Sequence, residues 1–152
     1  MALPFNQSVT NMATITEAFV LEHSVLCQMF DEIERILAGS PSAQEVKRLA
    51  SLVEALLSHH GEHENNLAGS VLNHVLVERG ALLPLYQDHN EISGHFPRVH
   101  RTSDSAKASR LLHKALSATR KHFKLEEQTL FPILEKTLQP DTLLVLGSQW
   151  RK

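Results

Sequence analysis

Histidine and glutamate residues that could bind a metal recur at helical spacing in this chain. The sequence contains ten histidines among 152 residues. His60 precedes Glu64 by four positions, and His122 precedes Glu126 by four, so each of these pairs would lie on one side of a helix. Two further histidines, His23 and His89, stand alone within regularly spaced apolar residues.

The apolar spacing predicts that the two single histidines point into a core. One series is separated by alternating fours and threes: Phe19, His23, Leu26, Phe30, Ile33 and Leu37. A second series has the same alternation of threes and fours: Leu82, Leu85, His89, Ile92, Phe96 and Val99. Residues at this period share the face of a helix that packs inside a bundle. Both imidazoles are therefore expected to face inward.

The two histidine–glutamate pairs also fall on apolar helix faces. At about 100° per residue, His60 lies within about 10° of the centre of its apolar face, and Glu64 shares that face one turn later. In the last helical segment Glu126 lies about 20° from the apolar centre, with His122 one turn earlier on the same side. Both pairs are therefore expected inside.

Six such polar groups in an apolar core require compensation. Each buried carboxylate or imidazole costs on the order of several kcal/mol unless it is paired or bound to a metal. Two glutamates can bridge two cations while four histidines complete the coordination, as in di-metal carboxylate bundles. Imidazole and carboxylate together suit iron, with manganese or zinc possible. The expected ligands of two bridged, non-haem iron ions are His23, His60, Glu64, His89, His122 and Glu126.

Four helices are expected to position these residues. They cover residues of about 15–37, 42–79, 84–100 and 104–138, each bounded by glycine, proline or polar residues. Ser42 with Glu45 forms a possible capping box, Pro84 suits a first helical turn, and Asp104 is a plausible N-cap. No segment has the alternating pattern of a strand. The predicted fold is all-α, an antiparallel up-down-up-down four-helix bundle.

Composition bounds the domain organisation and the possible partners. Residues 1–152 are expected to form one domain with a helical core of about 15–138, leaving residues 1–13 and the last dozen outside it. A net charge of -2 gives no electrostatic reason to expect nucleic acid or a membrane as partner. The lone Cys27 excludes an internal disulfide and a multi-cysteine metal motif. With no secretion signal and no membrane span in the pattern, a cytoplasmic location is expected.

The histidine motifs resemble those of a known family. The run His122-Phe-Lys-Leu-Glu126-Glu-Gln-Thr-Leu-Phe-Pro132 resembles the HxxxEE and LFP signature of hemerythrin-like proteins, the HHE cation-binding domains. Residues 57–64 resemble the earlier counterpart of that signature. With His23 and His89, the order H, HxxxE, H, HxxxE covers about residues 15–138. This resemblance implies a single hemerythrin-like domain with a di-iron centre.

The sequence departs from the pattern of classical oxygen-carrying hemerythrins, which have HxxxH on the third helix and HxxxxD on the fourth. Here Ser93 follows His89 by four positions, and Glu127 stands where the aspartate would be. A dedicated reversible oxygen carrier is therefore less favoured. Glu127 itself is expected beside the ligands or exposed to solvent.

The sequence allows two choices for the inward-facing pair of the second helix. Leu67 follows His59 by eight positions, as Leu130 follows His122, so this spacing would make His59 and His63 the inward pair of the second helix. The helical projection favours His60 and Glu64 instead, with His63 as an extra ligand or a neighbour of the ligands.

The ligand count leaves a coordination position for a small exogenous ligand. We expect dioxygen, peroxide or nitric oxide to bind there, either reversibly in a binding or sensing module or with turnover in a redox enzyme. Iron storage or metal handling without redox turnover is the alternative. A purely structural bundle with a metal-free core is a further one. The sequence indicates no protein partner and no oligomeric state.

Overall fold

The computed structural model describes residues 13–79 and 82–150, with side chains described for residues 13–65 and 87–150. These residues form helices and short connections, with no strand among them. The helices are α1 (Ile15–Ala38), α2 (Ala43–Arg79), α3 (Leu82–Arg101), α4 (Ser105–Leu125), the π-helical η1 (Glu126–Leu130), α5 (Phe131–Thr137) and α6 (Pro140–Trp150). The predicted all-α class is confirmed for this part of the chain.

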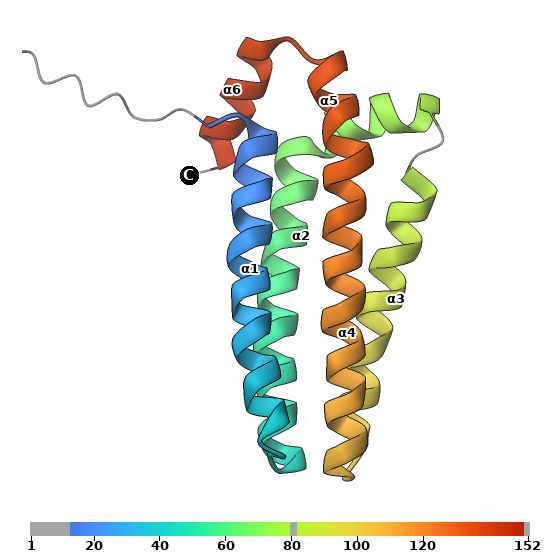
Figure 1. The fold of residues 1–152 in the computed structure, drawn as a ribbon. Helices are drawn as coiled ribbons and strands as arrows, with labels where there is room; N and C mark the ends of the chain where they lie inside the picture. The colour runs from blue at the N-terminus through green and yellow to red at the C-terminus, as the bar shows by residue number, and fades with distance from the viewer. Residues whose placement is uncertain (1–12, 80–81, 151–152) are drawn as a thin grey trace, which may run out of the picture.

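The four long helices α1, α2, α3 and α4 lie side by side, and successive helices run in opposite directions (Figure 1). The last part of α2 turns away from its first part and crosses one end of the molecule toward α3. At the same end, α5 continues the line of α4, and α6 folds back against α1. The four expected helices are thus accompanied by further helical segments.

Local capping explains where several helices begin. Thr14 caps α1 in a reciprocal capping box with Glu17. The predicted box at the start of α2 is present, because Ser42 N–H donates to Glu45 and Glu45 N–H donates to Ser42 Oγ. Asp104 accepts from the N–H of the third residue of α4, as expected of an N-cap. These contacts satisfy backbone N–H groups that lack a partner within the helix.

The expectations for the last part of the chain require correction. The fourth helix was expected to be one α-helix to about residue 138, whereas α4 ends at Leu125 and is followed by the π turn η1 and by α5. The last dozen residues were expected outside the core, whereas α6 packs on α1. Its Trp150 ring lies 4.3 Å from the Phe19 ring, centroid to centroid, and Leu143 is buried. Apolar contact with α1 therefore fixes a segment whose own sequence periodicity is weak.

Two apolar cores flank the level at which the candidate ligands lie. The larger includes Leu26, Phe30 and Phe123, and the smaller includes Phe19 and Phe131. The His23 ring lies between them, 4.0 Å from the Phe123 ring and 5.8 Å from the Phe131 ring. A polar layer thus interrupts the apolar interior at one height.

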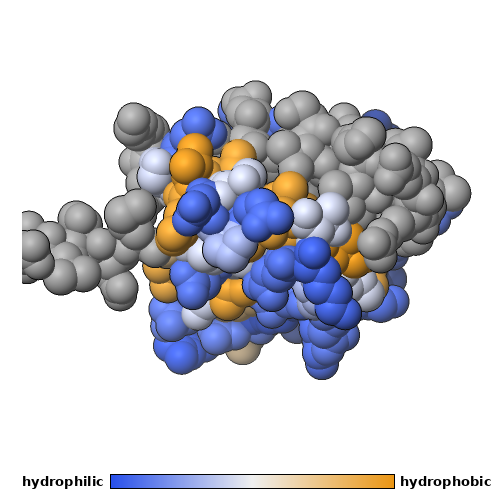
Figure 2. Space-filling view, turned by 90° about the horizontal axis from the view of Figure 1, so that it is seen from above, coloured by the Kyte–Doolittle hydropathy of each residue, from blue (hydrophilic) through white to orange (hydrophobic). Residues whose placement is uncertain are grey.

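The outer surface is mixed in character. Seen from above, hydrophobic residues are interspersed with hydrophilic ones (Figure 2). The large apolar side chains found exposed are Val20, Leu21, Val25, Ile36, Leu52 and Val145. Within the described residues, no helix has the length and apolar character needed to cross a membrane.

Gly147 marks the closest approach of α6 to α1. A Cβ atom at this position would lie 2.1 Å from the Ala13 carbonyl oxygen and 2.7 Å from the Thr14 carbonyl carbon. Backbone atoms cannot rotate aside, so Gly147→Ala should lower the free energy of unfolding by about 1–3 kcal/mol. The control Gly94→Ala, where nothing lies within 4 Å, should raise it by about 0.5–1 kcal/mol. Urea denaturation measures both, and equal stabilities would contradict this docking of α6.

Candidate metal centre

The six residues expected to bind metal come together in the structure. Ligand atoms of four of them, His23, His60, Glu64 and Glu126, all lie within 4.8 Å of one another. A second group under the same limit contains His89, His122 and Glu126. The two groups share one carboxylate, and their members come from α1, α2, α3, α4 and η1. Their role as metal ligands stays a prediction.

Burial of these side chains is strong but uneven. His23, His60, His122 and Glu126 are each no more than 5% exposed. His89 is the exception, because 42% of its side chain is accessible to solvent. The expectation of a fully inward His89 is therefore too strong. Its imidazole lies at the border of the cluster, where it can meet solvent or an incoming ligand.

Glu126 stands between histidines of two different helices. Its Oε1 lies 2.8 Å from Nε2 of His122 on α4, and its Oε2 lies 3.1 Å from Nε2 of His23 on α1. The two carboxylate oxygens are therefore directed to opposite sides.

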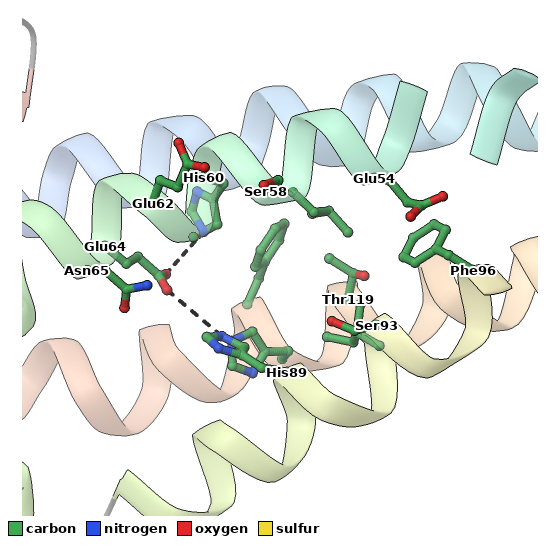
Figure 3. A pocket seen from close by; sticks show the side chains of 15 residues that line it. Glu54, Ser58, His60, Glu62, Glu64, Asn65, His89, Ser93, Phe96 and Thr119 are labelled. Carbon is green, nitrogen blue, oxygen red and sulfur yellow. Dashed lines mark hydrogen bonds and ion pairs between the residues drawn. The ribbon is translucent and has the colours of Figure 1, made fainter. Parts of the chain in front are cut away.

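Glu64 repeats this division on α2. Its Oε1 lies 3.1 Å from Nε2 of His60, and its Oε2 lies 3.9 Å from Nε2 of His89 (Figure 3). The Nε2 atoms of His89 and His122 are only 2.8 Å apart. Two imidazole nitrogens at this distance need a proton between them or a cation that both can bind.

Three outer carboxylates contact the opposite nitrogens of the buried rings. The Nδ1 atoms are paired at 2.9 Å in His23–Glu127, 2.9 Å in His60–Glu22 and 3.2 Å in His122–Asp88. The expectation that Glu127 lies beside the ligands is consistent with this contact. The sequence reasoning missed Glu22 and Asp88. A signal existed, because each outer carboxylate immediately precedes or follows one of the six candidate ligands in the chain.

The π turn η1 begins with two neighbouring glutamates that contact the same imidazole. The N–H of Phe131 donates to the Glu126 carbonyl, five residues earlier, instead of the usual four. Glu126 contacts Nε2 of His23 and Glu127 contacts its Nδ1. Single π turns inside α-helices occur often at functional sites.

Charge in the cluster shifts several pKa values. Burial alone would lower the pKa of His60, but the hydrogen bond to Glu22 and the adjacent negative charge of Glu64 outweigh it and raise the pKa to about 10. Burial and the nearby charge of Glu126 raise the pKa of Glu64. Burial would also raise the pKa of Glu126, but its close contacts with His122 and His23 hold the pKa well below the usual range. Buried carboxylates of this kind need positive charge beside them.

Buried atoms without partners support a cation as the source of that charge. Within the described residues, Nε2 of His23, Nε2 of His60 and Oε2 of Glu126 are buried and make no hydrogen bond. They lie at ion-pair distance from neighbouring groups but lack the geometry of hydrogen bonds. Buried polar atoms are rarely left in this way. A metal ion among them would satisfy lone pairs and charge together.

A cavity of about 410 Å³ opens beside the cluster between α2, α3 and α4. His60, Glu64, His89 and His122 are among the residues that line it, and Figure 3 shows this cavity from close by. Serine and threonine side chains together with phenylalanine rings form other parts of the wall. A small ligand could therefore reach the histidines from this side.

The structure bears on the register left open in α2. Neither His59 nor His63 belongs to the two groups of potential metal ligands found among the described residues. Their rings lie 4.2 Å apart, and the His63 ring lies 4.5 Å from the Trp150 ring of α6. The geometry favours the register with His60 and Glu64 inside.

These observations define an all-helical protein whose buried histidines and glutamates fit metal binding. Residues 84–143 match the family model of the hemerythrin HHE cation binding domain. The predicted resemblance to this family is thereby confirmed, over a segment that contains His89, His122 and Glu126. Comparison with curated proteins and with solved structures gave no match.

The two central glutamates should differ in their effect on the metal-free protein. Glu126 has a histidine within 3.1 Å of each carboxylate oxygen, so Glu126→Gln should lower the free energy of unfolding by about 1.5–3 kcal/mol, the usual loss for contacts to a charged group. Glu64→Gln should lower it less, because the neutral amide relieves repulsion from Glu126. Chemical denaturation in the presence of a chelator measures both. Equal losses would contradict the unequal pairing described above.

Proposed function

We propose that this protein holds two bridged, non-haem iron ions in a centre of hemerythrin type, and that α1–α4 act as an up-down-up-down four-helix bundle around it. The proposal is supported by the way in which the two oxygens of each central carboxylate point to different pairs of histidines. Each of Glu64 and Glu126 directs one oxygen toward the His23 and His60 side and the other toward the His89 and His122 side. Such a carboxylate can bridge two cations.

Two metal positions follow from this division. His23 and His60 would hold the first ion, His89 and His122 the second, and the glutamates would lie between them. The mixed nitrogen and oxygen donor set favours iron, with manganese or zinc as other candidates.

The cavity supports a small ligand as the partner of this centre. The half-exposed His89 lines this cavity, so the second position is the more accessible one. We infer that dioxygen, peroxide or nitric oxide binds or reacts there. When bound, iron would supply a Lewis acid and a one-electron redox couple. The protein would supply fixed imidazoles and an apolar surround that limits the access of water.

Iron storage without redox turnover is the alternative. It would be favoured by further clusters of metal-binding side chains. The groups of potential ligands identified in the described residues are the two that meet at Glu126. We therefore rank storage second.

Metal content tests the proposal directly. Anaerobic loading with ferrous iron, followed by desalting and elemental analysis, should give about two iron ions per chain. Glu126→Ala removes the shared carboxylate and should leave less than about one. Glu62→Ala, an exposed glutamate at the same cavity, should keep the wild-type content. A wild-type protein that retains no metal would contradict the proposal.

The single tryptophan offers an optical test. The Trp150 ring lies 6.4 Å from the His60 ring. Ferrous or cobaltous ions have unfilled d shells that accept excitation energy at short range, so their binding should quench Trp150 fluorescence. Zinc, with a filled shell, should quench much less. His60→Ala should abolish saturable quenching. Quenching that never saturates would indicate collisions in solution and not binding at this centre.

A further inference from the structure

The outer carboxylates form a pattern that the proposed ligand set does not include. Three of the four imidazoles in the candidate ligand set have a carboxylate on Nδ1: Glu127 on His23, Glu22 on His60 and Asp88 on His122. All three carboxylates are partly exposed, at 36%, 23% and 32% respectively. They are therefore kept near the buried rings although solvent is within reach.

A carboxylate on Nδ1 decides which nitrogen of an imidazole is free. An ionised carboxylate can only accept, so Nδ1 carries the hydrogen and donates it. The neutral ring then has its lone pair on Nε2. In His23, His60 and His122, Nε2 is the atom directed at the central glutamates. The outer contacts thus favour the tautomer that can bind a metal inside the cluster.

Each outer carboxylate also joins two elements of the fold. Glu22 on α1 holds a ring of α2, Asp88 on α3 holds a ring of α4, and Glu127 on η1 holds a ring of α1. Every one of them is next in sequence to a candidate ligand on its own element. A movement of one element would therefore disturb ligands on two.

We propose that Glu22, Asp88 and Glu127 are positioning residues, an inference that rests on the proposed function. They fix the tautomer and orientation of His60, His122 and His23, and they make these imidazoles stronger donors to the metal ions. Because each adds negative charge near the centre, they also favour the ferric state over the ferrous one.

Affinity for zinc alone provides the first test, by competition with a chromophoric chelator. Glu22→Ala, Asp88→Ala and Glu127→Ala should each bind zinc about 10- to 100-fold more weakly than the wild type. Glu22→Gln, Asp88→Asn and Glu127→Gln should lose less, because an amide oxygen still accepts from Nδ1–H. The matched controls are Glu62→Ala and Glu62→Gln, which remove the same charge at the cavity without a contact to a candidate ligand.

The midpoint potential of the iron-loaded protein provides the second test. The three amide variants should have more positive potentials than the wild type, whereas Glu62→Gln should not. Thermal unfolding of each metal-free variant checks that it is folded. Each variant is expected to fold, because the three carboxylates are partly exposed and their replacement leaves the apolar cores intact.

The outcomes separate this proposal from the proposed function. A wild-type protein that binds no zinc or iron would overturn the metal centre itself. If the wild type binds two ions and folded alanine variants bind zinc equally well, the positioning role is wrong. Losses no larger than those of Glu62→Ala would also overturn it, since the effect would then be one of overall charge.

Discussion

The compensation of charge around Glu126 is the constraint on which the rest of the structure depends. This carboxylate is 2% exposed, lies between two apolar cores and has a histidine on each oxygen. Such a group is tolerable inside a protein only if positive charge accompanies it. Apolar packing in the two cores therefore holds the helices together on both sides of Glu126, and paired charges hold them together at the level of Glu126 itself.

The polar layer is more than a ring of ligands, because hydrogen bonds extend it outward to the surface. From a central glutamate the contacts pass through an imidazole to an outer carboxylate, as in the path Glu64, His60, Glu22. Each contact along this path limits the orientation of the next side chain. The cavity approaches the layer beside His89, the imidazole least enclosed by protein. The imidazoles that contact outer carboxylates are thus held rigidly, whereas a small ligand would approach the centre beside His89.

Periodicity was sufficient to predict the all-helical class and the convergence of the inward side chains. A histidine in a series such as Phe19, His23, Leu26 has a direction that the helix alone determines. The partners of Glu22 and Asp88 could not be found in this way, because both lie on helix faces that periodicity assigns to solvent. Their contacts depend on how neighbouring helices pack, which involves residues far apart in the chain. The π turn and the docking of α6 were missed for the same reason, since tertiary packing determines both.

The π turn separates two requirements that one straight α-helix would have to meet together. Before the turn, the rotation of the chain is set by the need of His122 and Glu126 to face inward. After it, Phe131 and Leu134 must enter the second apolar core. A π turn acts as one additional residue in an α-helix and so shifts the angular phase of everything that follows. The part before the turn is therefore constrained by the metal-site residues, and the part after it is constrained separately by the second apolar core.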